Sequence, residues 1–228
     1  MNRWIQACVA IGMSVLMSAH AFAADQEFDY AGQKNAGDEV ARIVFIADAG
    51  THGDKGNHEF MAGAMFISRA INAHYPMAHA VVHSTKNWPK DLSHADTVVV
   101  LLNHSRKAAT NPAVIAAVDK PGAGFAAIHY GVEVHKGEQG DRFLRWMGGY
   151  FETHWSVNPH WTAEVKELPD HPVARGVVPF TVNDEWYFHM RFRPQMQGVT
   201  PVLTAVAPDS TMKRKDGPAH WSGPLRFW

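Results

Sequence analysis

Short apolar runs separated by polar and glycine-containing stretches dominate the first half of the chain. Four of them, at residues 42–48, 78–83, 96–102 and 124–128, have the length of strands and end in polar or turn residues. Runs of this kind predict strands of a buried, mostly parallel sheet. The last run contains only small and apolar residues, so we expect a strand that is covered on both faces.

Helical spacing of apolar residues appears between the predicted strands. One stripe repeats at i, i+4, i+7 and i+11 and consists of Phe60, Ala64, Ile67 and Ile71. It predicts a helix that begins at His58, after Asn57 as a cap. Asn111 followed by Pro112 predicts a second helix, which runs to about Val118. The alternation predicts an α/β fold, a doubly wound and mostly parallel sheet with helices on both faces.

The pattern becomes less regular after residue 130. Residues 141–147 predict a short helix, 162–168 alternate like an edge strand, and 199–207 predict a last strand. Between the first two of these elements, residues 150–161 have no clear periodicity and are expected to form a loop. The second half therefore adds smaller elements to the predicted sheet.

The first 23 residues have the composition of a secretory signal peptide. Arg3 supplies the positive charge, a short apolar run follows, and Ala21-Phe22-Ala23 is a typical cleavage sequence. The apolar run is too short to span a bilayer comfortably. We expect a periplasmic or secreted protein that has no membrane attachment after cleavage. No repeat or linker divides residues 24–228, so we expect a single domain there.

Composition and charge exclude several classes of function. The chain of 228 residues is 46% hydrophobic and 19% charged, which suits a folded domain with a core. A formal net charge of -1 gives no electrostatic attraction for nucleic acid. Cys8, the one cysteine, lies in the signal peptide, so the mature chain has no disulfide, thiolate ligand or cysteine nucleophile. The composition is compatible with a homo-oligomer as well as with a monomer.

A glycine-containing loop at residues 49–57 follows the first predicted strand. It has neither the Lys-Ser/Thr ending of a P-loop nor the G-x-G-x-x-G spacing, so no nucleotide cofactor is expected. The loop carries His52 and leads into His58 and Glu59. Ligands of open α/β sheets bind at the carboxyl ends of the strands, so these three side chains are candidate substrate-binding residues.

His129 stands where the run at 124–128 ends. Ile128-His129-Tyr130-Gly131 has the outline of a nucleophile elbow, with histidine in the nucleophile's position. The alternative is a histidine that only caps the strand. We interpret His129 as a catalytic acid–base residue, because further histidines occur in the neighbouring loops.

The predicted loop at 150–161 is crowded with polar and aromatic residues. Its candidate substrate-binding residues are His154, Asn158, His160 and Trp161. Binding residues concentrate on loops that a rigid sheet supports. We expect this loop to fold over the end of the sheet that carries His129 and to place His154 near His129 and His58. Trp161 either stacks on a sugar ring or belongs to the core.

Glu185 is the second candidate catalytic residue. It follows Asp184 directly, and adjacent residues of a strand point to opposite faces. Only one of the two carboxylates is therefore expected in the site. We assign the acid–base role to Glu185 and a turn or cap to Asp184.

Histidine and carboxylate side chains without thiolates also suit a divalent metal such as Zn²⁺, Mn²⁺ or Fe²⁺. The candidate ligands are His58, Glu59, His129 and His154. No His-Glu-x-x-His motif supports this cofactor. The equal alternative is a polar sugar pocket in which the same groups form hydrogen bonds and hold no metal.

Taken together in chain order, several short motifs resemble the ThuA-like proteins, which are named for trehalose utilisation. The resemblance extends over about residues 42–203 and is specific as a combination. The matching residues are Gly53 with His58-Glu59-Phe60, Gly124 with His129-Tyr130, Trp146-Met147-Gly148-Gly149-Tyr150-Phe151, His154, Asn158-Pro159, His171-Pro172 with Arg175-Gly176, and Asp184-Glu185-Trp186-Tyr187.

The resemblance implies a flavodoxin-like fold of the class I glutamine-amidotransferase type. His129 stands where amidotransferases carry their cysteine, so glutamine hydrolysis is not implied. The resemblance implies instead an exported carbohydrate-processing protein that acts on a disaccharide or a keto-sugar derivative. Such a protein would be a hydrolase, a lyase or an isomerase. The alternatives are a non-catalytic sugar-binding or accessory domain, or a truncated inactive copy. A truncated copy is one of these alternatives because members of the family usually continue into a further strand and a glycine-rich, histidine-containing end.

The predicted signal peptide can be tested on protein from an exporting host. Mass spectrometry of the periplasmic fraction should show a mature N-terminus at or next to Ala24, because cleavage follows Ala21-Phe22-Ala23. A periplasmic protein that still begins at Met1 would contradict cleavage.

Overall fold

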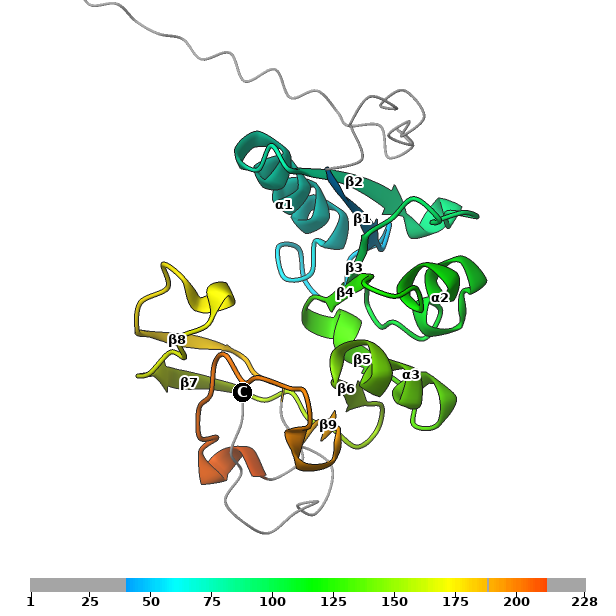
Figure 1. The fold of residues 1–228 in the computed structure, drawn as a ribbon. Coiled ribbons are helices and arrows are strands. Elements are labelled where there is room, and N and C mark those ends of the chain that lie inside the picture. Colours follow the sequence, from blue (N-terminus) through cyan, green and yellow to red (C-terminus); the bar gives the residue numbers. More distant parts are fainter. Residues whose placement is uncertain (1–39, 188, 213–228) are drawn as a thin grey trace, which may run out of the picture.

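A four-stranded parallel sheet with the order β2-β1-β3-β4 forms the centre of this computed structural model (Figure 1). The structure describes residues 40–187 and 189–212, and the predicted signal peptide at 1–23 lies outside them. Within those two ranges no helix is both long and apolar enough to cross a membrane. The strands are β1 (Ala41–Ala47), β2 (Ala78–Ser84), β3 (Thr97–Leu101) and β4 (Gly124–Ala127).

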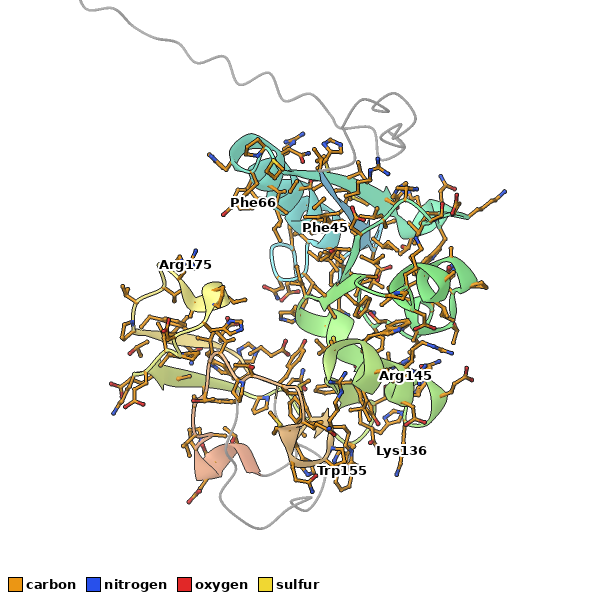
Figure 2. The ribbon with its side chains drawn as sticks, viewed as in Figure 1. Phe45, Phe66, Lys136, Arg145, Trp155 and Arg175 are labelled. Carbon is orange, nitrogen blue, oxygen red and sulfur yellow. The ribbon has the colours of Figure 1, made fainter. Side chains whose placement is uncertain are left out.

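Helices cover both faces of this sheet. Helix α1 (Phe60–His74) packs on the face that carries Phe45, while α2 (Pro112–Val118) packs on the face that carries Val44. Helix α3 (Glu138–Met147) lies on the same side as α2. In Figure 2 Phe45 lies between sheet and helix, whereas Phe66 points outward from α1 and is 75% exposed. The α/β, flavodoxin-like architecture is therefore confirmed.

The predicted stripe of α1 faces the sheet as expected. Phe60 and Ala64 are buried, and Ile67 and Ile71 pack against the same cluster. The predicted start of the helix is wrong by two residues. The backbone of His58 forms an antiparallel bridge with His52, so the helix begins only at Phe60, and Asn57 does not cap it.

The amino end of α2 matches its prediction. The Asn111 side-chain oxygen accepts hydrogen bonds from the amides of Ala113 (2.9 Å) and Val114 (3.2 Å), and Pro112 occupies the first helical position. This cap satisfies two amides that have no partner inside the helix.

The predicted burial of β4 on both faces is wrong. β4 pairs only with β3 and forms the outer edge of the parallel sheet among the described residues, and Ala126 is exposed. The chain then turns at η4 (His129–Val132) instead of entering another helix. Small apolar residues thus serve an edge strand here, a position that the composition of the run alone does not distinguish from a central one.

The second half forms two small sheets (Figure 1). Strands β5 (Glu133–Val134), β6 (Gly149–Glu152) and β9 (Arg191–Phe192) form one, and β7 (His160–Val165) pairs antiparallel with β8 (Phe180–Glu185) in the other. The predicted loop at 150–161 therefore begins inside a strand and ends inside another. The predicted strand at 199–207 does not form as a regular strand. Further 3-10 turns are Thr85–Asn87, Ala108–Thr110, Pro172–Ala174, Pro194–Met196 and Asp209–Met212.

Asp48 ties the carboxyl ends of three strands together. It follows β1, and its carboxylate accepts hydrogen bonds from the Thr85 hydroxyl after β2 (2.8 Å) and from the Asn103 amide after β3 (2.7 Å). Its own amide donates to the Leu101 carbonyl (3.0 Å). These bonds fix the edge of the sheet from which the loops with His52 and His58 depart.

The Asn111 cap should contribute measurably to stability. Asn111→Ala removes the acceptor for both helix amides and should lower the free energy of unfolding by about 1 kcal/mol, measured by urea denaturation. Asn111→Asp keeps the acceptor and should stay close to the wild type. Equal losses in the two variants would show that the side-chain oxygen does not act as a cap.

Candidate functional site

Three side chains from distant parts of the chain meet at the carboxyl edge of the parallel sheet. His58 stands in the loop after β1, His129 follows β4, and Glu185 ends β8. His129 Nε2 lies 3.3 Å from Glu185 Oε2, and His58 Nε2 lies 4.0 Å from the same oxygen. The side chain of His129 is 39% exposed and those of His58 and Glu185 are each 17% exposed, so solvent reaches this cluster. We call these three residues the His–Glu cluster.

The glycine-containing loop folds back to place His58. Gly53 (φ 71°) and Gly56 (φ 94°) adopt positive φ angles that favour glycine, and between them the chain reverses to form the bridge between His52 and His58. The Nδ1–H of His58 donates to the His52 carbonyl oxygen (2.9 Å). The Glu59 carboxylate accepts from the Gly56 amide (3.0 Å), so it serves the loop and is not part of the cluster.

His129 lies at a tight turn, as the elbow-like sequence predicted. Its φ angle is 53°, which is in the left-handed region and costs a residue with a side chain about 1–2 kcal/mol. A Cβ atom on the following Gly131 would come within 3.0 Å of the Val100 carbonyl oxygen. The turn therefore packs closely against β3 and places the His129 ring at the edge of the sheet.

Two polar groups lie close to one nitrogen of the His129 ring. Nδ1 accepts from the Tyr130 amide (2.8 Å) and lies 2.8 Å from the Tyr187 hydroxyl. The hydrogen of the neutral ring is then on Nε2, which faces Glu185. Burial lowers the pKa of His129 below 6.5; the charge of Glu185 opposes this shift, and that of His58 adds to it.

Glu185 is held from two directions. Besides its contact with His129, its Oε1 accepts from the Asn158 side-chain amide (2.6 Å). The neighbouring Asp184 is exposed, and its Oδ1 accepts from the Glu185 amide (2.8 Å). The structure thus gives the two carboxylates different positions, with Asp184 in a local backbone contact.

Two tyrosines belong to the site although the sequence analysis did not select them. Burial raises the pKa of Tyr187, and the nearby Glu185 charge adds to that shift. Burial and the Glu133 carboxylate raise the pKa of Tyr130 to about 12, so both rings keep their hydroxyl protons at neutral pH. A signal existed for Tyr187, because it stands two positions after Glu185, the spacing of side chains on one side of an extended segment.

Of the residues predicted for the loop at 150–161, Asn158 donates a side-chain hydrogen bond to the cluster, at Glu185. His154 is exposed, has a φ angle of 67°, and has no contact with the cluster among the described residues. His160 is paired with Glu185 in the register of β7 and β8 and is exposed. Trp161 is buried with Ala163 and Ala207, so its role is in the core of the small sheet.

The other tryptophans of this region are engaged in packing. Trp186 packs against the Trp161 ring and donates its Nε1–H to the Trp161 carbonyl oxygen (3.0 Å). Trp155 lies beside β9 (Figure 2), where Arg191 stacks over its ring at 4.3 Å. Neither arrangement presents a ring to the His–Glu cluster.

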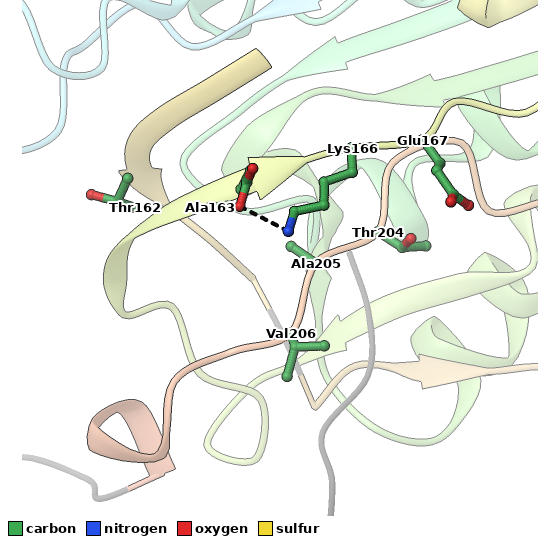
Figure 3. A pocket seen from close by; sticks show the side chains of 8 residues that line it. Thr162, Ala163, Lys166, Glu167, Thr204, Ala205 and Val206 are labelled. Atoms are coloured by element: carbon green, nitrogen blue, oxygen red, sulfur yellow. Dashed lines mark ion pairs between the residues drawn. The ribbon is translucent and has the colours of Figure 1, made fainter. Parts of the chain in front are cut away.

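A cavity of about 690 Å³ lies beside the small sheet of β7 and β8 rather than at the His–Glu cluster (Figure 3). Glu164 and Lys166 form an ion pair there (3.2 Å). The lining residues are Thr162, Ala163, Glu164, Lys166, Glu167, Thr204, Ala205 and Val206. This cavity contains none of the predicted site residues.

The His–Glu cluster has the residue types of a metal site but not the required lone pairs. Its three potential ligand atoms lie within 4.8 Å of one another. A cation would need the lone pair of His129 Nε2, yet the Tyr130 amide can only donate to Nδ1, which leaves the hydrogen on Nε2. The present arrangement therefore does not fit a bound metal, and Glu59 and His154 do not supply further ligands to it.

Comparisons with known proteins give one family. A family model described as ThuA, trehalose utilisation, matches residues 49–226. A crystal structure from Bacteroides uniformis, described as ThuA-like, is similar over 73% of this chain and 68% of that chain, with 18% sequence identity and a TM-score of 0.49. A search of curated proteins returned no match.

The backbone strain at His129 predicts an order of stability for two variants. His129→Ala and His129→Gly both remove the ring and its hydrogen bonds, but glycine adopts a φ angle of 53° without the side-chain penalty. The glycine variant should therefore be more stable than the alanine variant by about 1 kcal/mol in chemical denaturation. A more stable alanine variant would mean that the turn relaxes to a negative φ angle once the ring is removed.

Proposed function

The chain belongs to the ThuA family, and from that premise we propose that it is an exported carbohydrate-processing enzyme acting on disaccharides or keto-sugar derivatives. The description of the family, trehalose utilisation, supports a disaccharide-related substrate. The signal-peptide pattern at residues 1–23 supports export.

The His–Glu cluster is the observation that carries the proposal. It combines a hydrogen-bond donor, His129 Nε2–H, with the partly buried carboxylate of Glu185 and the ring of His58. Paired imidazole and carboxylate groups of this kind move protons to and from a substrate, which typically accelerates a reaction by 10²–10⁴-fold. Hydrolysis, elimination and isomerisation of sugars all need such transfers.

Glutamine hydrolysis does not fit these residues. Its nucleophile is a cysteine, and Cys8, the one cysteine of the chain, lies within the predicted signal peptide. His129 occupies the tight turn after β4 instead. A neutral imidazole in that position supports proton transfer rather than a covalent thioester.

The rings around the cluster support a sugar as ligand. The His129 ring lies 5.2 Å from that of Tyr187, and the His52 ring lies 5.5 Å from that of Tyr130. Tyrosine offers both an apolar face and a hydroxyl group, which suits the mixed surface of a pyranose. Asn158 adds an amide beside Glu185.

The test is turnover by the purified mature chain. Disaccharides, including trehalose, and their keto derivatives are incubated with the protein, and new sugar signals are followed by NMR. Glu185→Gln should lower turnover about 100-fold or more, because the amide removes the carboxylate charge. Asp184→Asn is the matched control and should keep most of the activity, since Asp184 is exposed and its Oδ1 bond to the backbone is retained.

Two outcomes would overturn the proposal. Saturable sugar binding without product would identify a binding or accessory domain. Turnover that Glu185→Gln leaves unchanged would place the chemistry away from the His–Glu cluster.

A further inference from the structure

The two histidines of the cluster both face Glu185 with their Nε2 atoms, but the hydrogen of the neutral ring is on a different nitrogen in each. His58 Nδ1 faces the His52 carbonyl oxygen, which can only accept, so the hydrogen of His58 is on Nδ1. His129 Nδ1 faces the Tyr130 amide, which can only donate, so the hydrogen of neutral His129 is on Nε2. The partners thus fix one tautomer for each ring.

We propose that His58 is the group that takes a proton from the substrate and that His129 is a positioning donor for Glu185. This assignment deepens the proposed function and rests on it. Only His58 directs a lone pair, that of Nε2, toward the cluster, 4.0 Å from Glu185 Oε2. His129 directs an N–H group at the same oxygen and has no lone pair there.

The surroundings of His58 suit a base that becomes charged for part of the reaction. The groups that face its ring are the Glu185 carboxylate, the His129 ring at 4.8 Å edge-on, the His52 ring at 5.0 Å and the Phe60 ring at 5.9 Å. Glu185 is the negative charge among them, and a neutral His129 adds no positive charge. A proton on His58 Nε2 therefore lies beside a carboxylate, whose negative charge stabilises the imidazolium.

The proton step balances within the site. As the substrate O–H bond, or the C–H bond next to a carbonyl, breaks, the proton forms a bond with His58 Nε2. The bonding electron pair stays on the substrate oxygen or carbon. The imidazolium keeps its Nδ1–H bond to the His52 carbonyl and is stabilised by Glu185. The same proton returns to the product in a later step, so His58 ends neutral.

The fixed backbone partners explain why the roles do not exchange. For His129 to act as the base toward the cluster, its hydrogen would have to move to Nδ1, where it would oppose the Tyr130 N–H. For His58 to act as the donor in its neutral form, it would have to give up the bond to the His52 carbonyl. Each exchange loses a hydrogen bond to the main chain, which costs about 1 kcal/mol or more.

The tautomers are tested directly by NMR of the mature chain labelled with ¹⁵N-histidine, at about pH 8, where an ordinary histidine is neutral. Long-range ¹H–¹⁵N correlations, assigned with single-site variants, should show His58 protonated on Nδ1 and His129 on Nε2. His58 protonated on Nε2 would overturn the assignment, whatever the protein's activity.

A second measurement tests the role of His58 in turnover of the sugar panel. His58→Ala should lower turnover about 100-fold or more, and added imidazole should restore part of it, because a free base can replace the missing ring. Imidazole should not rescue Glu185→Gln. His74→Gln changes an exposed histidine at the end of α1 and is the control that should leave both the spectra of the cluster and turnover unchanged.

The two proposals fail in distinguishable ways. The expected tautomers without turnover of any sugar would overturn the proposed function and leave the ring assignment standing. Turnover with a fully active His58→Ala would overturn the role of His58. Zinc binding by the wild type that His58→Ala and His129→Gln both abolish would show that the rings are ligands, which also overturns it.

Discussion

The carboxylate of Glu185 is the point at which the parts of the structure meet. Glu185 ends β8 of the small antiparallel sheet, yet its oxygens contact His129, which follows β4, and Asn158, which precedes β7. A carboxylate that is only 17% exposed needs donors around it, because burial of an unpaired charge is costly. The site therefore exists only when the small sheet is seated against the edge of the parallel sheet.

The parallel sheet prepares that edge before Glu185 reaches it. Parallel strands bring their carboxyl ends to one side, and Asp48 joins the ends of β1, β2 and β3 through Thr85, Asn103 and Leu101. The loop after β1 then folds back on itself to aim His58, and the turn after β4 holds His129 in a strained left-handed conformation. Rigid elements of this kind keep the side chains of the His–Glu cluster in place at a cost in local backbone energy.

Much of the parallel layer could be read from the chain, since periodicity and capping are local properties. The strands at 42–48 and 96–102 and the Asn111 cap match β1, β3 and α2 closely. Prediction failed where long-range pairing decides. The run at 124–128 looks like a central strand but lies at the edge, and residues 199–207 were predicted as a strand but form no regular one. Trp161 looked like a binding residue until its burial showed it to be core.

The sequence by itself determined which chemistry is available: many histidines, two adjacent carboxylates at 184 and 185, and one cysteine, Cys8, within the predicted signal peptide. It also determined that His129 would stand at the end of an apolar strand. Only the tertiary structure decided that Glu185 and Asn158 join His58 and His129, whereas Glu59 and His154 do not. It alone decided which ring carries a lone pair toward the cluster, because a tautomer depends on the group that each nitrogen faces, and those groups are backbone atoms placed by the fold.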